Sequence, residues 1–533
     1  MNIAIVVLYL IAMLAFGFWG RRRTRTSSDF LVAGRRLGPF LYTGTMAAVV
    51  LGGASTVGGV GLGYKYGISG MWLVVAIGTG VILLSLLFAP AIQRLRVYTV
   101  SQMLELRYGS RVATQTSSIV MLAYTVMLCA TSTSAYATIF VVLFGWDRWL
   151  AIAVGGVVVL IYSTIGGMWS ITLADQVQFV IKTIGVFFLM LPFALNAAGG
   201  FSGMSARLEA SFFSWDGAGV QWIITQFVVY TFGLLIGQDI WQRVFTARTP
   251  VVARWGGTTA GIYCVLYGVA GALIGMAAKV ALGPIKVRDD VYAEVAQNIL
   301  PIGIGGIVLA AAVAAMMSTA SGALIAAATV ARTDVVPFVA SWFGKRVEVD
   351  ATADPEHDVR GNRMWILVIG VVVITISCLL SLGESTTGVV VALLTIAYDI
   401  LVGGLLVAIL GGLVFRRGTG TGAAVSMVVG TVVTLGTMTI LEINAAVPLD
   451  GVYANEPIYY GLIASAVSYV VVSLLSRATA APVLAAWDER RAGRGFFDAA
   501  ADPRTATLRT TAPAGSDTVA GSSSVDAADR PTH

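Results

Sequence analysis

The chain has 533 residues, of which 57% are apolar and 12% charged, and its formal net charge is +6. A soluble domain carries roughly 25% charged residues, so this composition excludes a water-soluble globular fold. The positive charge requires no nucleic-acid partner, because arginines beside anionic lipid headgroups account for it. The three cysteines lie within apolar segments and indicate no disulfide framework.

Apolar stretches near the length that spans a bilayer, about twenty residues, follow one another along the whole chain. We therefore predict an all-α polytopic membrane protein with about 13 transmembrane helices. The predicted spans are residues 2–20, 38–63, 70–92, 113–143, 149–168, 174–197, 221–240, 255–282, 303–331, 364–382, 388–414, 421–441 and 457–476.

The loops between these spans share their basic residues unevenly. If the N-terminus lies outside, the inner loops hold twenty Lys and Arg residues and the outer loops hold six. This bias predicts a multi-pass protein of the cell membrane with its N-terminus outside and its C-terminus in the cytoplasm. Arg21, Arg22 and Arg23 follow the first apolar stretch, which favours a retained helix over a cleavable signal peptide.

The composition changes after the last predicted span. Residues 477–533 are rich in Ser, Thr, Ala, Pro and Asp, and such a segment buries too little apolar surface to fold alone. We predict a cytoplasmic, mostly disordered tail that begins with an interfacial helix around residues 481–497.

The second stretch is unusually rich in glycine around Gly52-Gly53-Ala54-Ser55-Thr56. Either the helix is unwound near its middle, so that carbonyl oxygens are exposed as ligands for a cation such as sodium, or small residues here let helices pack closely.

The ninth stretch places three hydroxyls, those of Ser318, Thr319 and Ser321, in one turn of an otherwise apolar helix. Ala315 lies one turn before Ser318 on about the same face. These groups either complete a cation site together with a backbone carbonyl, or bond back to their own helix.

Ionisable residues inside membrane spans are costly and are therefore functional candidates. Asp175 opens the sixth stretch, and it either attracts a cation or is stabilised by the dipole at the helix start. Lys182 lies two turns further along, where it pairs with a carboxylate or extends toward the interface. Asp399 lies inside the eleventh stretch with no basic neighbour in sequence, either in a coupling site or as a protonated structural donor.

The middle of the seventh stretch contains two aromatic residues, Tyr230 and Phe232, close to Gly233. This pattern predicts either a substrate gate or simple packing. The sequence contains no phosphate-binding loop, no zinc-ligand spacing and no nucleophile elbow. We therefore predict neither an enzyme nor an ATP-driven pump, and no cofactor.

The order of these landmarks over residues 1–476 resembles the sodium:solute symporter family, which includes bacterial proline, pantothenate and sugar symporters. The residues that carry the resemblance are the basic loop 21–36, the glycine run that ends at Tyr64, the Gly-Gly…Asp-x-x-Gln element that contains Asp175, Gln242-Arg243, Met317-Ser318-Thr319-Ala320-Ser321 and Arg332-Thr333-Asp334.

The resemblance implies a LeuT-type fold with two inverted repeats of five helices. These would be residues 38–197 and 221–414, with an additional N-terminal helix (1–20) and two C-terminal helices (421–476) outside the core. It also implies a sodium site whose ligands are the carbonyls of Ala48, Leu51 and Ala315 and the hydroxyls of Ser318 and Thr319.

Asp175 matches an acidic residue that the family associates with sodium access. The preceding position often holds Thr in the family, whereas Ala174 stands here and supplies no hydroxyl. Positions that match sugar-contacting groups are mostly apolar, so a small organic acid or amino acid is favoured over a sugar. The candidate substrate-binding residues are Ser55, Thr56, Tyr230 and Phe232.

The sequence thus predicts a sodium-coupled secondary symporter that imports a small polar solute by alternating access. Its expected partners are the solute, sodium and the lipid bilayer, with no obligate protein partner and no nucleic acid. Two alternatives stay open. One is a proton-coupled carrier of the same fold that relies on Asp399 or Asp175, and the other is a membrane sensor that binds solute without moving it.

Overall fold

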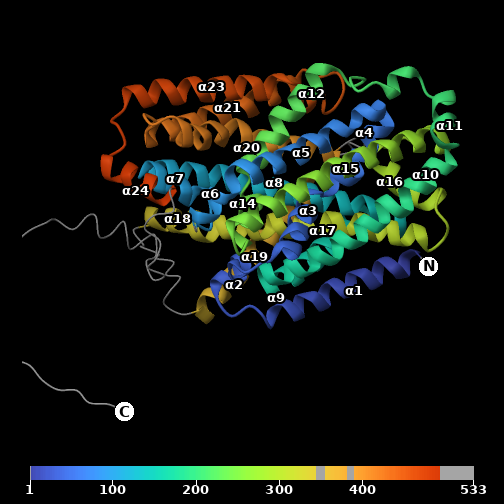
Figure 1. The fold of residues 1–533 in the computed structure, drawn as a ribbon, viewed down its shortest axis with the longest axis horizontal. Coiled ribbons are helices and arrows are strands. Elements are labelled where there is room, and N and C mark those ends of the chain that lie inside the picture. The colour runs from blue at the N-terminus through green and yellow to red at the C-terminus, as the bar shows by residue number, and fades with distance from the viewer. Residues whose placement is uncertain (1, 96, 344–354, 381–388, 492–533) are drawn as a thin grey trace, which may run out of the picture.

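The computed structural model describes residues 2–95, 97–343, 355–380 and 389–491, and nearly all of them lie on helices (Figure 1). Within these ranges, β pairing is limited to one isolated bridge between Leu37 and Ala247. The predicted interfacial helix corresponds to α24 (Ala481–Arg491), and the rest of the predicted tail, from residue 492, lies outside the described residues.

The elements up to residue 207 are α1 (Asn2–Arg21), α2 (Ser27–Val32), η1 (Ala33–Arg35), α3 (Pro39–Val50), the π-helical turn η2 (Ala54–Gly58), α4 (Gly59–Tyr66), η3 (Gly67–Met71), α5 (Trp72–Leu83), η4 (Leu84–Phe88), α6 (Ala89–Leu95), α7 (Val100–Tyr108), α8 (Arg111–Phe144), α9 (Arg148–Thr183), η5 (Ile184–Met190), α10 (Leu191–Ala197) and α11 (Gly200–Arg207). The later elements are α12 (Val220–Gln226), η7 (Phe227–Thr231), α13 (Phe232–Ile236), α14 (Gln238–Thr246), α15 (Pro250–Leu282), α16 (Val291–Asn298), α17 (Ile304–Val330), η9 (Ala331–Val335), α18 (Val336–Trp342), α19 (Pro355–Leu380), α20 (Val389–Val414), α21 (Gly420–Ile443), α22 (Asp450–Tyr453), α23 (Glu456–Leu475) and α24.

Ten helices in the described ranges are long and apolar enough to cross a membrane, or eleven if one bent pair counts as a span. The predicted number of thirteen is therefore not confirmed. Two of the ten, Ala54–Leu95 and Arg148–Ala197, are 42 and 50 residues long. Each contains a glycine with non-helical backbone angles, Gly67 (φ 67°, ψ −145°) and Gly167 (φ 55°, ψ −145°), at which the helix is broken, so parts of two predicted spans fall within each segment.

The most buried helix of the molecule is α17. In the apolar window of the span that it begins, 94% of the residues are buried, against 28% for α1 and for α23. Figure 1 shows α1 along one edge of the molecule and α23 with α21 along the opposite edge. The outer helices expose large apolar side chains, such as Leu8 at 68% and Ile463 at 62%. An apolar exterior around a buried α17 is the arrangement that lipid, as solvent, stabilises.

Two further apolar segments, residues 39–66 and 220–246, are also broken. In the first, α3 ends at Val50, and helical structure resumes at Gly53, directly before η2. The second break is at Gly237, where Val220–Ile236 and Gln238–Thr246 meet at an angle of 46°. The structure supports both interpretations of the glycine-rich second stretch: the helix is interrupted at residues 51–52, and an added Cβ would lie 2.5 Å from Thr319 at Gly52 and 2.2 Å from Ala135 at Gly53. Both breaks free backbone groups that other atoms must satisfy.

The long helix α9 consists of two helices joined at Gly167, whose φ of 55° and ψ of −145° are not helical. A Cβ atom at this position would lie 2.7 Å from the carbonyl oxygen of Phe30. This region of φ/ψ space is essentially restricted to glycine. The junction therefore depends on the absence of a side chain.

We expect Gly167→Ala to destabilise the protein by about 3 kcal/mol, because backbone strain and the clash with Phe30 add together. Gly145→Ala is the matched control: its φ is 67°, but nothing lies within 4 Å of an added Cβ, so only strain of about 1 kcal/mol is expected. Thermal unfolding of both purified variants measures the difference. Equal midpoints would show that the contact with Phe30 relaxes without cost.

Candidate functional site

A small cavity of about 20 Å³ lies between the two helix breaks. The first break contributes Gly53 and Ser55 to its lining, and the second contributes Asp239. The remaining walls include Thr319 of α17 and Tyr398 of α20. A largely apolar space with a few convergent polar groups is typical of a binding site for a small molecule.

Asp239 is the carboxylate that lines this cavity, and its side chain is almost fully buried. Its Oδ1 accepts a hydrogen bond of 2.9 Å from the hydroxyl of Tyr124, whose ring contacts Tyr398 edge-on at 5.6 Å. Within the described residues no ion pair to Asp239 is present. Asp239 was not among the site residues predicted from sequence, although an acidic residue close to a helix break, as in Gly237-Gln238-Asp239, was a signal for it.

The four predicted substrate-binding residues are not all brought together. Ser55 lines the cavity, whereas the Thr56 hydroxyl accepts a hydrogen bond of 3.1 Å from Tyr267. Tyr230 lies near the cavity, because its ring is 5.2 Å from that of Tyr398. Phe232 is 37% exposed and is not among the lining residues.

The predicted sodium ligands, in contrast, do meet, where the end of α3 approaches α17. The Thr319 hydroxyl donates to the carbonyl of Val49 at 2.6 Å and lies 3.5 Å from that of Ala315. The amine of Lys182, from α9, donates hydrogen bonds to the carbonyls of Ala48 at 3.0 Å and of Leu51 at 3.2 Å. These two carbonyls are ones that the family resemblance assigned to sodium.

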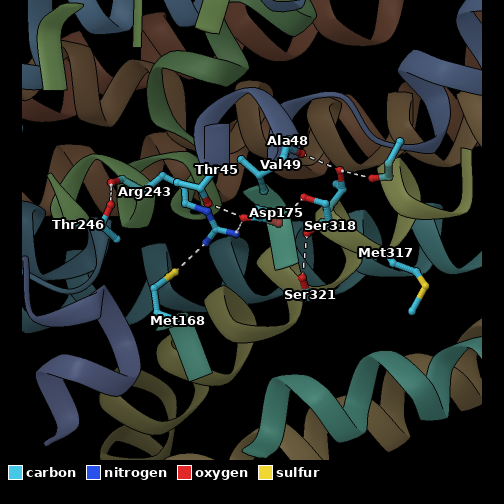
Figure 2. Close-up of polar contacts among 12 residues, drawn as sticks. Thr45, Ala48, Val49, Met168, Asp175, Arg243, Thr246, Met317, Ser318 and Ser321 are labelled. Atoms are coloured by element: carbon cyan, nitrogen blue, oxygen red, sulfur yellow. Dashed lines mark hydrogen bonds and ion pairs between the residues drawn. The ribbon is translucent and has the colours of Figure 1, made fainter. Parts of the chain in front are cut away.

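Asp175 lies at the centre of a buried polar cluster beside the predicted ligands (Figure 2). Its Oδ2 is 3.3 Å from Nη2 of Arg243, and both side chains are fully buried. Its Oδ1 accepts a hydrogen bond of 2.6 Å from the hydroxyl of Ser318, and the hydroxyl of Thr45 donates to its other oxygen. The carboxylate thus binds α3, α14 and α17 to α9. From sequence, Arg243 was identified as a landmark of the family resemblance and not as the partner of Asp175.

Asp399 is also buried, at 2% exposure, but it lies apart from these groups. Its Oδ1 has no hydrogen-bond partner in the described part of the chain, and its neighbour Tyr398, not Asp399 itself, lines the cavity. A role for Asp399 in coupling stays a prediction.

Comparison with known proteins gives consistent results. The model of the "Sodium:solute symporter family" matches residues 30–430. The "Osmoregulated proline transporter OpuE" of Bacillus subtilis is 26% identical over 500 residues, which cover 90% of this chain and 96% of that protein. The "High-affinity choline transporter 1" of Caenorhabditis elegans is 24% identical over 363 residues, 62% of each chain.

Among solved structures, the chain superimposes on a Na⁺-coupled sialic acid symporter in a substrate-bound outward-open state with a TM-score of 0.75. The sequence identity is 16%, and the match covers 90% of this chain and 98% of the symporter. At this identity the match establishes the fold, which is that of LeuT-type transporters.

Proposed function

Because the chain belongs to the sodium:solute symporter family, we propose that it imports a compact solute that carries a positively charged nitrogen. The family and the relatives are transporters, not enzymes, and they support a sodium-coupled symporter that crosses the membrane many times. Family membership does not indicate which solute is carried, whereas the residues that line the cavity favour one class of solute.

The observation that carries the proposal is the carboxylate of Asp239 in the cavity wall. A buried carboxylate without a cationic partner is costly, and a bound cation would offset that cost. Within the described residues Asp239 has a hydroxyl partner, Tyr124, but no ion pair. The ring of Tyr398 also lines the cavity, and a ring face there would favour a cation further, because ring faces attract positive charge.

A zwitterion would find a second partner across the cavity. The helical segment after the first break begins at Gly53 and Ala54, and both line the cavity. The first N–H groups of a helix lack intrahelical acceptors and carry partial positive charge, so they favour a carboxylate. Proline has both a cationic nitrogen and a carboxylate, and choline has the cationic nitrogen alone. The names of two relatives thus agree with the chemistry of the cavity.

Alternating access would follow from the predicted repeats. Residues 38–197 and 221–414 each contain one of the two breaks, and the cavity lies between them. Movement of one repeat against the other around a fixed central site is the usual mechanism of such carriers.

Family membership supports sodium as the coupling ion. Lys182 donates hydrogen bonds to the carbonyls of Ala48 and Leu51, two of the predicted sodium ligands. These contacts favour a second candidate function, which is a carrier of the same fold that does not bind its driving sodium ion at the predicted ligands.

The experiment that tests the proposal is uptake into proteoliposomes that contain the purified protein. The panel consists of proline, choline, acetate and glucose, with an inward gradient of sodium and, separately, of protons. We expect accumulation above equilibrium of proline or choline and none of acetate or glucose. Uptake of acetate or glucose alone would contradict the proposal, and binding of a solute without uptake would favour the sensor.

A further inference from the structure

The end of α3 is a place that favours a cation. The last carbonyls of a helix have no intrahelical partner and carry partial negative charge. Here the helix stops at Val50, and Leu51 and Gly52 follow in a non-helical segment before the chain resumes helical structure. The carbonyls of Ala48, Val49 and Leu51 must therefore be satisfied by other atoms.

Side chains already satisfy these carbonyls. Lys182 donates to Ala48 and Leu51, and Thr319 donates to Val49. The Ser318 hydroxyl donates to Asp175. The Thr319 hydroxyl also lies 3.5 Å from the carbonyl of Ala315, so all five predicted ligands have partners within the protein.

Lys182 has no carboxylate partner in an ion pair among the described residues. Its side chain is fully buried. Asp175, two turns earlier on the same helix, is paired with Arg243. The titratable groups that act on Lys182 are Asp175 and, from α15, the thiol of Cys264. The ammonium therefore depends on the carbonyls at the end of α3, as a bound metal ion would.

We infer that the amine of Lys182 takes the place of the sodium ion between α3 and α17. An ammonium brings the same single positive charge to the same carbonyls, but it is tethered to α9 and does not leave the site. The inference refines the proposed function, because it assumes a carrier of this family and removes sodium from this one position. Solute import then proceeds without a sodium ion bound by Ser318 and Thr319.

Sodium-dependent thermal stability of the full-length purified protein tests this inference without any solute. Sodium, relative to potassium, should shift the unfolding midpoint of the wild-type protein and of the double variant Ser318→Ala and Thr319→Ala by the same amount, because Lys182 is intact in both. Lys182→Ala removes the ammonium and opens its space. In that variant we expect sodium at about ten times its dissociation constant to raise the midpoint by roughly 1 °C.

The new sodium response of Lys182→Ala should disappear when Ser318→Ala and Thr319→Ala are added, which locates it at this site. Thr183→Ala is the matched control on the same helix: its hydroxyl bonds to Phe179 and Tyr263, so its loss should create no sodium response.

Two results would overturn the inference. One is a wild-type sodium shift that the Ser318 and Thr319 substitutions abolish, which can be measured even if Lys182→Ala fails to fold. The other is a folded Lys182→Ala protein without any gain in sodium response. Failure of the solute panel, in contrast, would reject the proposed function and leave these measurements unaffected.

Discussion

Asp239→Asn is expected to lower the affinity for proline or choline about a hundredfold. The substitution keeps the size of the side chain and its hydrogen bond with Tyr124, but it removes the negative charge that faces the cavity. Loss of a charged partner in a buried site costs about 2–3 kcal/mol, which corresponds to that change in dissociation constant. Isothermal titration of the purified protein with each solute measures it.

Two controls separate charge from structure. Tyr124→Phe removes the hydroxyl that donates to Asp239 and leaves the carboxylate in place, so we expect only a severalfold loss of affinity. Asp239→Asn should retain the thermal midpoint of wild type to within a few degrees. If Asp239→Asn left the affinities for proline and choline unchanged while both bind to wild type, the carboxylate would not be their partner.

Asp175→Asn is expected to destabilise the folded protein by about 3–5 kcal/mol. It leaves the fully buried guanidinium of Arg243 without a counter-charge, and breaking one side of a buried ion pair is far more costly than replacing the whole pair. Addition of Arg243→Met to Asp175→Asn should therefore recover a large part of the loss. Thermal unfolding of the two single variants and the double variant measures the coupling between the residues.

An exposed ion pair of the same chain provides the matched control. Arg416 and Asp488 are 2.9 Å apart, but their side chains are 84% and 52% exposed. Water screens such a pair, so Asp488→Asn should cost less than about 1 kcal/mol. If Asp175→Asn were as mild as Asp488→Asn, the carboxylate of Asp175 would not be holding the charge of Arg243.

The sequence by itself determined the class of protein and the position of its special segments. Hydropathy is a local property, so apolar stretches identified the membrane helices without knowledge of their packing. The glycines at 52 and 53 indicated the break after α3, and the hydroxyls of Ser318 and Thr319 indicated the face of α17 that meets it. The number of spans stays a prediction, because two of the long apolar segments, Ala54–Leu95 and Arg148–Ala197, are broken at Gly67 and Gly167.

Tertiary structure alone decided which charges meet. Arg243 pairs with Asp175 from 68 residues away, and the Lys182 amine reaches the carbonyl of Ala48 across 134 residues. Asp239 faces a cavity whose other walls come from α3, α8, α17 and α20. The partner of a buried charge depends on how helices far apart in the chain pack together, and neither spacing nor composition records that packing.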